Sequence, residues 1–455
     1  MTSVIDGSQF RPPTLPAGTA VAPPGPATTW NPGTWHVADA DGVVIGFVAI
    51  DRIVAGRSCG GIRAGPRVTA QQIERIARVM TLKCGFVGVA AGGAKGGVIV
   101  PESFTDEERA ARLDAYGRAV AALLRSGVWS HGADMGTTDF DIARIRHAAG
   151  IAPDPGLSPT SPPAAAGDAS SGMAAGLTVA LATEAALEAL GIPLSGARIA
   201  IHGVGAVGRA AMTALAAAGA RIVAVSTVAG AICDDSGMDA QSVLEEARRL
   251  GDRFTAGAAA PEALLDVSCD ALLLCGGADV IDTKSAQAIR ARTIICGANI
   301  PFVDEVAERF ERRGILVLPD FVAGGGGVLG STLVAVAGLT PGELAAVMRR
   351  QFKPLVEQTI AQARTSGTTV AAQAREKALR TLAACEAAYG AQRADTLLPE
   401  KLAPRASAPV RFVLAAERRV RGSRRLAPLA RLLHGTVVDR AERVLCATRT
   451  VGAAL

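Results

Sequence analysis

The stretch RIAIHGVGAVGRAAMTALAAAGARIVAV, residues 198–225, decides the fold. Its first residues, Arg198–His202, form a short apolar segment that predicts a strand, and the glycine-rich GVGAVG follows over Gly203–Gly208. We expect a helix over Arg209–Ala218 and a second strand over Arg221–Val225. A strand, spaced glycines, a helix and another strand within roughly 30 residues are typical of a dinucleotide-binding unit.

Each glycine has a physical role in such a unit. Gly203 permits the tight turn, Gly205 lets the backbone approach a pyrophosphate, and Gly208 lets the helix pack closely on the strand. Ala206 and Val207 lie between these glycines, and the N-terminus of the helix that follows favours negative charge. These five residues are the expected pyrophosphate contacts. The alternative is a glycine-rich turn in an α/β unit of another kind.

The segments around this unit predict a doubly wound parallel sheet. Three further apolar strands alternate with helical segments: Ala271–Cys275, Thr293–Cys296 and Ile315–Leu318. A long Ala/Leu helix over Gly176–Leu190 precedes the glycine loop, and helices from 341 to about 394 end the body of the chain. This region is expected to be a Rossmann dinucleotide-binding domain.

The N-terminal half predicts a mixed α/β domain. Asp41-Gly42 separates two apolar stretches and suits the tight turn of a hairpin. Thr69 and Thr105 each precede a helical apolar pattern with capping-box spacing. In the stretch 152–167, five prolines end this alternation of strands and helices. We expect a linker there.

The expected division of the chain follows from these changes in composition. It comprises a flexible Pro-rich leader (1–33), a mixed α/β domain (34–160), a Rossmann domain (168–340) and a basic tail (396–455).

Composition and length exclude several classes of protein. With 455 residues, 49% hydrophobic and 20% charged, the chain is neither a small stapled fold nor extensively disordered. No apolar run reaches the roughly 20 residues of a membrane span, and the N-terminus lacks a secretory pattern, so we expect a cytoplasmic protein. The 8 cysteines include no CxxC pair, so no metal site is expected.

Positive charge is concentrated at the C-terminus. Residues 401–455 contain twelve Lys/Arg and three Asp/Glu, whereas the rest of the chain is mildly acidic. Nucleic-acid modules usually interleave aromatic with basic residues, and Phe412 is the one aromatic residue in this tail. We therefore favour a solvated or subunit-contacting helical tail over a nucleic-acid arm.

Two lysines and an aspartate are the candidate catalytic groups. Lys83 continues the buried stripe of a helix, and Lys95 lies in GGAKGG, where glycines are expected to fold the backbone around one ammonium group. If both enter one pocket, their repulsion would lower the pKa of at least one towards roughly 7 to 8. The alternative is two surface lysines. Taken alone, Asp134 is more often a turn or cap residue.

At this point five segments together resemble the Glu/Leu/Phe/Val dehydrogenases. They are GGIRAGPRVTAQQIERIARVMTLKCGFVGVAAGGAKGGVIV (60–100), GADMGTTDFDI (132–142), GVGAVG (203–208), IICGANIP (294–301) and LVLPDFVAGGGGV (316–328). Residues 80–100 look most like the glutamate dehydrogenase branch. The resemblance spans roughly residues 35–390, and it implies NAD(P)-dependent interconversion of an L-amino acid with its 2-oxo acid and ammonia, in a homo-oligomer. It also implies that residues 34–160, joined by the helices 341–395, form a substrate and oligomerisation domain.

The resemblance also implies roles for individual residues. Lys83 matches the lysine that binds the substrate α-carboxylate, Lys95 the one that activates water, and Asp134 the aspartate that moves protons on the amine. Val328 matches an apolar wall of the side-chain pocket, and Ser331 a polar contact there. Cofactor contacts carried over from the family are Gly203, Gly205, Ala206, Val207, Gly208, Thr227 and Asn299.

Several positions depart from the family pattern. Cys59 stands where glutamate dehydrogenases have a lysine for the side-chain carboxylate, and a thiol cannot supply that charge. Arg63 and Arg67 are alternative sources of a cation. Around the cofactor, the family residues are replaced at Met173, Thr227, Asp279 and Gly324. No acid follows the second strand at Thr227, so use of both NAD and NADP is expected.

Two other functions compete with the dehydrogenase interpretation. One is a cofactor-binding regulatory homologue with reduced or lost turnover, which would have no need to keep two buried lysines. The other is a 2-hydroxy-acid dehydrogenase, which would need a His/Arg pair beside the nucleotide domain. His202 precedes the glycine loop without such a partner motif, so this function ranks last.

Overall fold

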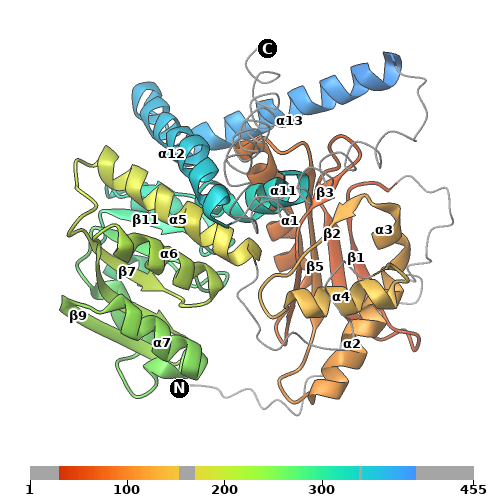
Figure 1. Cartoon of the computed structure of the whole chain (residues 1–455), viewed down its shortest axis with the longest axis horizontal. Helices are drawn as coiled ribbons and strands as arrows, with labels where there is room; N and C mark the ends of the chain where they lie inside the picture. The colour runs from red at the N-terminus through yellow and green to blue at the C-terminus, as the bar shows by residue number, and fades with distance from the viewer. Residues whose placement is uncertain (1–29, 153–169, 338–340, 396–455) are drawn as a thin grey trace, which may run out of the picture. The chain divides into compact units, whose positions relative to one another are not determined.

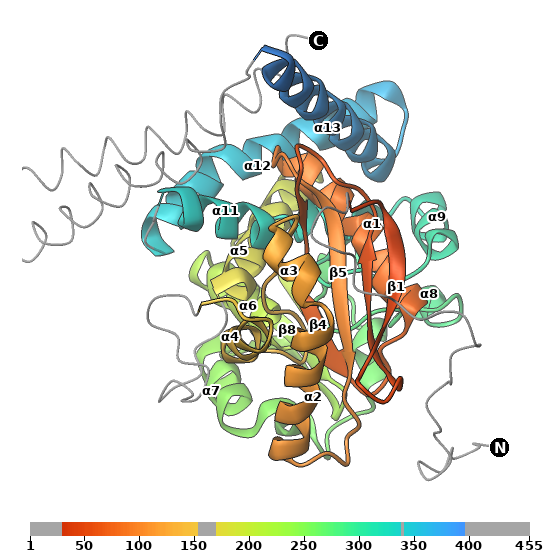
Figure 2. The same cartoon turned by 90° about the vertical axis from the view of Figure 1, so that its right-hand side faces the viewer.

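The computed structural model describes residues 30–152, 170–337 and 341–395, drawn in colour in Figure 1 and Figure 2. They form two compact units: 30–81 with 92–152, and 82–91 with 170–395 apart from 338–340. The basic tail lies outside the described residues, as does nearly all of the leader and of the Pro-rich stretch.

The first unit contains a six-stranded mixed sheet in the order β1-β2-β5-β3-β6, with β4 also paired to β5. The strands are β1 (Gly33–Ala38), β2 (Val44–Ile50), β3 (Ser58–Cys59), β4 (Ile62–Gly65), β5 (Gly92–Ile99) and β6 (Trp129–Ser130). β1 and β2 form the expected hairpin, and Gly42 in its turn has φ +78°. β5 runs antiparallel to β2 and parallel to β3 and β4.

Four helices accompany this sheet: α1 (Ala70–Val87), α2 (Asp106–Ala119), α3 (Ala121–Ser126) and α4 (Asp139–Ala148). The caps expected at Thr69 and Thr105 are confirmed, because each hydroxyl accepts a hydrogen bond from the backbone N–H three residues later. Thr138 caps α4 in the same way. The first part of α1 belongs to the first unit, and its end, from Leu82, belongs to the second.

The expectation that the glycines of GGAKGG fold the backbone around the ammonium group of Lys95 is wrong, because these residues lie in the strand β5, which is buried along its whole length. The glycines are needed for packing rather than for a turn. A Cβ at Gly96 would lie 2.6 Å from the Trp129 ring, and one at Gly97 would lie 2.5 Å from Val68. Side chains from both sides therefore fill the space beside this strand.

The second unit contains a six-stranded sheet in the order β12-β11-β10-β7-β8-β9. The strands are β7 (Arg198–His202), β8 (Arg221–Thr227), β9 (Gly230–Met238), β10 (Ala271–Leu274), β11 (Thr293–Cys296) and β12 (Leu316–Leu318). Five of them pair in parallel as expected, whereas β9 was not expected and pairs antiparallel with β8 at the edge. The doubly wound class is thus confirmed with one antiparallel addition.

Helices cover both faces of this sheet. They are α5 (Ser170–Ala189), α6 (Ala206–Ala217), α7 (Ala240–Leu250), α8 (Ser285–Ala288), α9 (Asp304–Arg312), α10 (Asp320–Ala323), α11 (Gly326–Ala337), α12 (Pro341–Ser366) and α13 (Val370–Asp395), with 3₁₀ turns over Gly251–Thr255 and Pro261–Asp266. α5 and α6 pack side by side on one face (Figure 1). Residues of α8, α9 and the second 3₁₀ turn complete the core on the other.

The helices α12 and α13 differ from expectation in the unit that they join. We expected them to complete the N-terminal domain, but they belong to the second unit. The reason is that α12 packs along α5, where Lys353 binds Glu188 over 2.7 Å and Arg349 binds Glu184 over 2.8 Å. In the described parts of the chain, no helix is long and apolar enough to cross a membrane.

Candidate active site

Three charged residues form a buried cluster in the first unit. Lys95 on β5 is only 1% exposed, and its Nζ forms an ion pair with Oδ2 of Asp134. Arg63 on β4 donates from Nε to the other carboxylate oxygen, Oδ1, over 3.0 Å. Two cations therefore hold one carboxylate, one at each oxygen.

These contacts determine the charge of Asp134. Burial disfavours its charged form, but Lys95 and Arg63 together outweigh that effect and hold the pKa of the carboxyl well below its usual range. Asp134 is consequently a carboxylate at neutral pH. In the first unit, the charged group beside Lys95 is thus the carboxylate of Asp134, and not the second lysine expected from the sequence. Arg63 binds Asp134 through Nε, whereas its buried Nη1 has no hydrogen-bond partner among the described residues, so Arg63 stays an alternative source of a cation.

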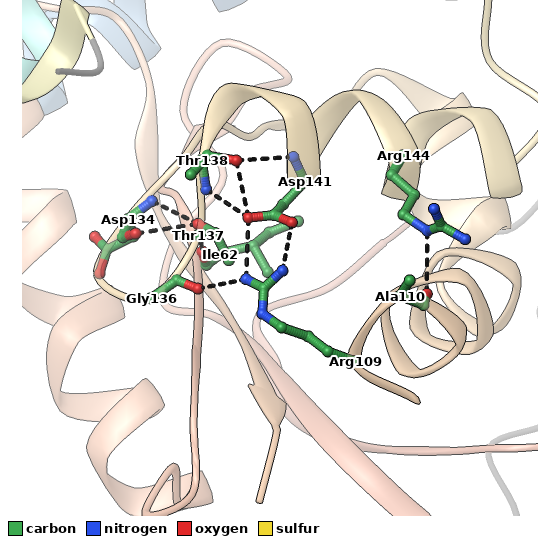
Figure 3. Close-up of polar contacts among 9 residues, drawn as sticks. All are labelled: Ile62, Arg109, Ala110, Asp134, Gly136, Thr137, Thr138, Asp141 and Arg144. Atoms are coloured by element: carbon green, nitrogen blue, oxygen red, sulfur yellow. Dashed lines mark hydrogen bonds and ion pairs between the residues drawn. The ribbon is translucent and has the colours of Figure 1, made fainter. Parts of the chain in front are cut away.

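Asp134 lies in the turn between β6 and α4, and Figure 3 shows how this turn is held. The Asp134 N–H donates to the hydroxyl of Thr137 over 3.0 Å, and the Thr137 N–H donates back to the Asp134 carbonyl over 2.9 Å. The Thr137 hydroxyl donates to the carbonyl of Ile62 on β4 over 2.8 Å. Asp134 is thus more than a turn residue, since its carboxylate also binds two cations.

A second polar cluster lies in the second unit. Lys83, 6% exposed, donates from Nζ to Oδ1 of Asn299 over 2.8 Å. This hydrogen bond joins Lys83, which was expected to bind the substrate, to Asn299, which was expected to bind the cofactor. A Cβ at Gly324 would lie 3.1 Å from the same Nζ, so this glycine leaves space beside the ammonium group.

Asp320 is a residue of this cluster that the sequence analysis missed. Its carboxylate accepts hydrogen bonds from the N–H groups of Ile300 over 2.6 Å and Phe321 over 2.8 Å. Burial raises the pKa of Asp320, and the charge of Lys83 opposes that rise. The signal that could have revealed it is an acid directly after the strand β12, at the carboxyl edge of a parallel sheet.

The glycine loop fits a dinucleotide pyrophosphate. Gly203 has φ +88°, and a Cβ there would lie 2.5 Å from Gly276, whereas a Cβ at Gly208 would lie 2.0 Å from the Gly203 carbonyl oxygen. In contrast, a Cβ at Gly205 would meet no atom of residues 30–152, 170–337 or 341–395 within 4 Å. The space in front of Gly205 is therefore open. Gly205 is also the N-cap of α6, whose first turn carries no acid, so its N-terminal amides can receive an anion.

Thr227 ends β8 but turns its hydroxyl into the protein. The Oγ1 atom donates to the Asp252 carbonyl over 2.7 Å, lies 2.7 Å from Oγ1 of Thr255 and accepts from the Ala229 N–H over 3.0 Å. Its side chain is therefore already satisfied. On the opposite face, the neighbouring Ser226 has a buried hydroxyl that finds no hydrogen-bond partner in the described parts of the chain.

The expected side-chain pocket residues come from both units. Cys59 pairs with Gly93 of β5 and is partly buried. Val328 and Ser331 lie on α11 in the second unit, where Val328 is 3% exposed and the Ser331 hydroxyl donates to its carbonyl over 3.1 Å. Among the departures, Asp279 has φ +52°, a conformation that Asp and Asn both tolerate, and Met173 is exposed.

Comparisons with known proteins agree with this architecture. Residues 34–149 match the family model described as Glu/Leu/Phe/Val dehydrogenase, dimerisation domain, and residues 167–390 match that of Glutamate/Leucine/Phenylalanine/Valine dehydrogenase. Glutamate dehydrogenase B of Halobacterium salinarum is 32% identical over 293 residues, which are 62% of this chain and 68% of that protein.

Two further similar proteins are glutamate dehydrogenases. The catabolic NAD-specific enzyme of Bacillus subtilis is 28% identical over 63% of this chain and 69% of its own length. The crystal structure of the hetero-hexameric enzyme of Thermus thermophilus, with Leu bound, has a TM-score of 0.66 and 26% identity over 81% of this chain and 90% of that one. The chain therefore belongs to the Glu/Leu/Phe/Val dehydrogenase family, and it is an amino-acid dehydrogenase that uses a nicotinamide cofactor for reversible oxidative deamination.

Proposed function

We propose that this dehydrogenase acts on L-amino acids with apolar or aromatic side chains at least as well as on glutamate. In this proposal Lys95 and Asp134 form the catalytic acid–base pair, and Lys83 binds the α-carboxylate of the substrate. The observation that carries the proposed catalytic roles is the buried ion pair between Lys95 and Asp134, with Arg63 as the second cation on the carboxylate.

The charges of this cluster suit the chemistry of an amine and a carbonyl. An ammonium group at Lys95 can polarise the carbonyl or imine and give up a proton, after which it can assist the attack of water on the imine. Asp134 then exchanges protons with the amine as ammonia leaves or enters. Arg63 stays charged throughout, so it keeps one cation on Asp134 while the proton of Lys95 moves.

In this proposal the second unit supplies the cation for the α-carboxylate and the amides that bind the cofactor. The Lys83 ammonium, held by Asn299, offers the positive charge that an α-carboxylate needs. The amides of Ala206, Val207 and Gly208 would hold the pyrophosphate of the cofactor. When bound there, the cofactor would supply hydride transfer from and to Cα.

Cys59 sets the proposed preference for substrates. A buried carboxylate side chain needs a cation, and the loss of that cation typically costs roughly 2 to 5 kcal/mol. Ser331 can donate a hydrogen bond but cannot neutralise a carboxylate. With a thiol at residue 59, 2-oxoglutarate should lose the advantage that it has in glutamate dehydrogenases.

The test is a comparison of kcat/KM with ammonia for 2-oxoglutarate, 4-methyl-2-oxopentanoate and phenylpyruvate, in the parent enzyme and in Cys59→Lys. We expect no advantage for 2-oxoglutarate in the parent, and a gain of roughly tens- to thousands-fold for it in Cys59→Lys. A parent that already prefers 2-oxoglutarate by about a hundredfold contradicts the proposal. NADH binding without turnover on any 2-oxo acid would support the regulatory alternative.

We also propose that the protein is a homo-oligomer. The support is the match of residues 34–149 to a dimerisation domain and the hexameric state named for the Thermus thermophilus enzyme. Light scattering on the full chain tests this directly, since a monomer at micromolar concentration contradicts it.

A further inference from the structure

We propose that Arg109 and Asp141 are positioning residues for Asp134. Their ion pair fixes the turn 134–137, and this turn holds the carboxylate against Lys95. The inference rests on the proposed catalytic role of Asp134. Neither residue was singled out by the sequence, where both look like solvated charges on two helices.

Arg109 joins α2 to both the turn and the start of α4. Its Nη1 donates to Oδ1 of Asp141 over 2.7 Å, and its Nη2 donates to Oδ2 over 3.0 Å. The same Nη2 also donates to the carbonyl of Gly136 over 2.9 Å (Figure 3). One planar guanidinium thus ties a helix N-terminus to the middle of the turn that carries Asp134.

Asp141 transmits this constraint along the chain. Its Oδ2 accepts from the N–H of Thr138 over 2.8 Å and from the Thr138 hydroxyl over 2.9 Å, and its own N–H donates to that hydroxyl over 3.2 Å. Thr138 adjoins Thr137, whose hydroxyl binds both the Asp134 N–H and the carbonyl of Ile62. Hydrogen bonds, together with the peptide bond between Thr137 and Thr138, therefore connect Arg109 to the backbone of Asp134.

The turn has little room to move without these bonds being broken. Gly136 has φ +78°, and a Cβ there would lie 1.9 Å from the carbonyl oxygen of Ala64 on β4. The Ala64 N–H in turn donates to the carbonyl of Met135 over 3.0 Å. β4 therefore packs against one side of the turn, and Arg109 binds its other side.

The ion pair is also largely shielded, with side-chain exposures of 31% for Arg109 and 5% for Asp141. Burial opposes the charge of Asp141, but Arg109 and Thr138 outweigh it and lower the pKa of the carboxyl. Both partners are therefore charged at neutral pH, and removal of one leaves the other without its partner.

A matched control lies on the same two helices. Arg144 of α4 binds Asp114 of α2 over 2.6 Å and donates from Nε to the carbonyl of Ala110 over 3.1 Å. Its side chain is 28% exposed, close to that of Arg109, but it joins the helices away from the turn (Figure 3). Loss of Arg144 should weaken the α2–α4 contact without releasing Asp134.

The experiment compares Arg109→Gln with Arg144→Gln in the full-length enzyme, by initial rates and by Tm. We expect both to lower Tm, whereas only Arg109→Gln should lower kcat, by about tenfold or more, since small misplacements of a reacting group are costly. The KM values for NADH and the 2-oxo acid should stay within about twofold of the parent, because neither variant removes a binding group. Arg109→Lys keeps the positive charge but loses the planar group that binds both carboxylate oxygens. Its kcat should therefore lie between those of the parent and Arg109→Gln.

Equal kcat values in Arg109→Gln and Arg144→Gln would overturn the inference. If Arg109→Gln fails to fold, Arg109→Lys and Arg144→Lys replace the pair, and equal kcat values again overturn it. Asp134→Asn separates the two proposals. If that variant is inactive while Arg109→Gln has full kcat, only the positioning role fails, whereas full turnover by Asp134→Asn refutes the catalytic role itself.

Discussion

At the scale of single residues, Lys95 combines almost complete burial with an opposite charge at contact distance. Lys95→Ala removes the group proposed to polarise the carbonyl and to transfer a proton. Such groups typically contribute a factor of roughly 10² to 10⁴, so kcat should fall by ~10² or more. The Kd for NADH should not change. Wild-type turnover by this variant, measured at saturating substrate, would refute the assignment.

The contacts of Asp134 change what its substitution should do to stability. From shape alone, Asp134→Asn is nearly isosteric and would leave Tm unaltered. Because the carboxylate lies between Lys95 and Arg63, the amide leaves two buried cations without their counter-charge. We therefore expect a loss of about 3 to 5 kcal/mol in the free energy of unfolding, together with nearly abolished amination.

The pH dependence of that loss follows from the lowered pKa of Asp134. In the unfolded chain an aspartate titrates near pH ~3.9, so the stabilisation by the native ion pairs is complete above about pH 4 and declines as the pH falls through the lower native pKa. The stability difference between parent and Asp134→Asn should therefore be constant from roughly pH 8 to pH 5. A difference that disappears already at pH 6 contradicts this account. Asp114→Asn, which breaks the ion pair with Arg144, is the control.

At the scale of elements, the glycines of β5 make a sharp prediction. A Cβ at Gly96 would lie 2.6 Å from the Trp129 ring and 2.8 Å from the Tyr116 hydroxyl, so Gly96→Ala should destabilise the protein by about 1 to 3 kcal/mol through overpacking. Gly65 on the adjacent β4 is the control, since a Cβ there meets nothing within 4 Å. Thermal unfolding of both variants checks this, and equal Tm values would show that β5 is less tightly packed than described.

Elements with a local signal could be predicted from the sequence. β7 has the expected bounds, and the caps at Thr69 and Thr105 mark the starts of α1 and α2, because a cap depends on residues three apart. β5 was missed because four glycines in six residues indicate a turn, whereas the need for them arises from side chains of distant segments. β9 was missed because its polar sequence lies at a sheet edge, where little burial is required.

At the scale of the whole molecule, the candidate site could be predicted only in part. Its residue types and order along the chain revealed Lys83, Lys95, Asp134 and the glycine loop. Their partners did not follow, because contacts such as Lys83 with Asn299 join positions 216 residues apart. No local sequence pattern marks Arg63 or Asp320. Their roles become visible only in the structure, where Arg63 binds Asp134 and Asp320 interacts with Lys83.

The choice of cofactor is a property of the second unit and yields the last prediction. In NAD-selective sites an acid at the end of the second strand binds the ribose 2′-hydroxyl and repels a 2′-phosphate. Here β8 ends in Thr227, whose hydroxyl is engaged within the protein, and no Lys or Arg occurs from 222 to 247 to attract a phosphate. We expect kcat/KM values for NADH and NADPH within about tenfold of each other, because β8 ends without the acid that would repel a 2′-phosphate and residues 222–247 contain no Lys or Arg to attract one.

A designed change between β8 and β9 tests whether charge determines the choice between NADH and NADPH. Val228 follows Thr227 and is 85% exposed, so Val228→Arg adds a cation there without burying it. This variant should shift the ratio of kcat/KM towards NADPH, because an arginine can bind a 2′-phosphate. Val303→Arg, at a 43% exposed position elsewhere in the second unit, should leave the ratio unchanged. A preference of the parent for NADH above about a hundredfold would refute dual use, and it would mean that 2′-phosphate is excluded by shape rather than by charge.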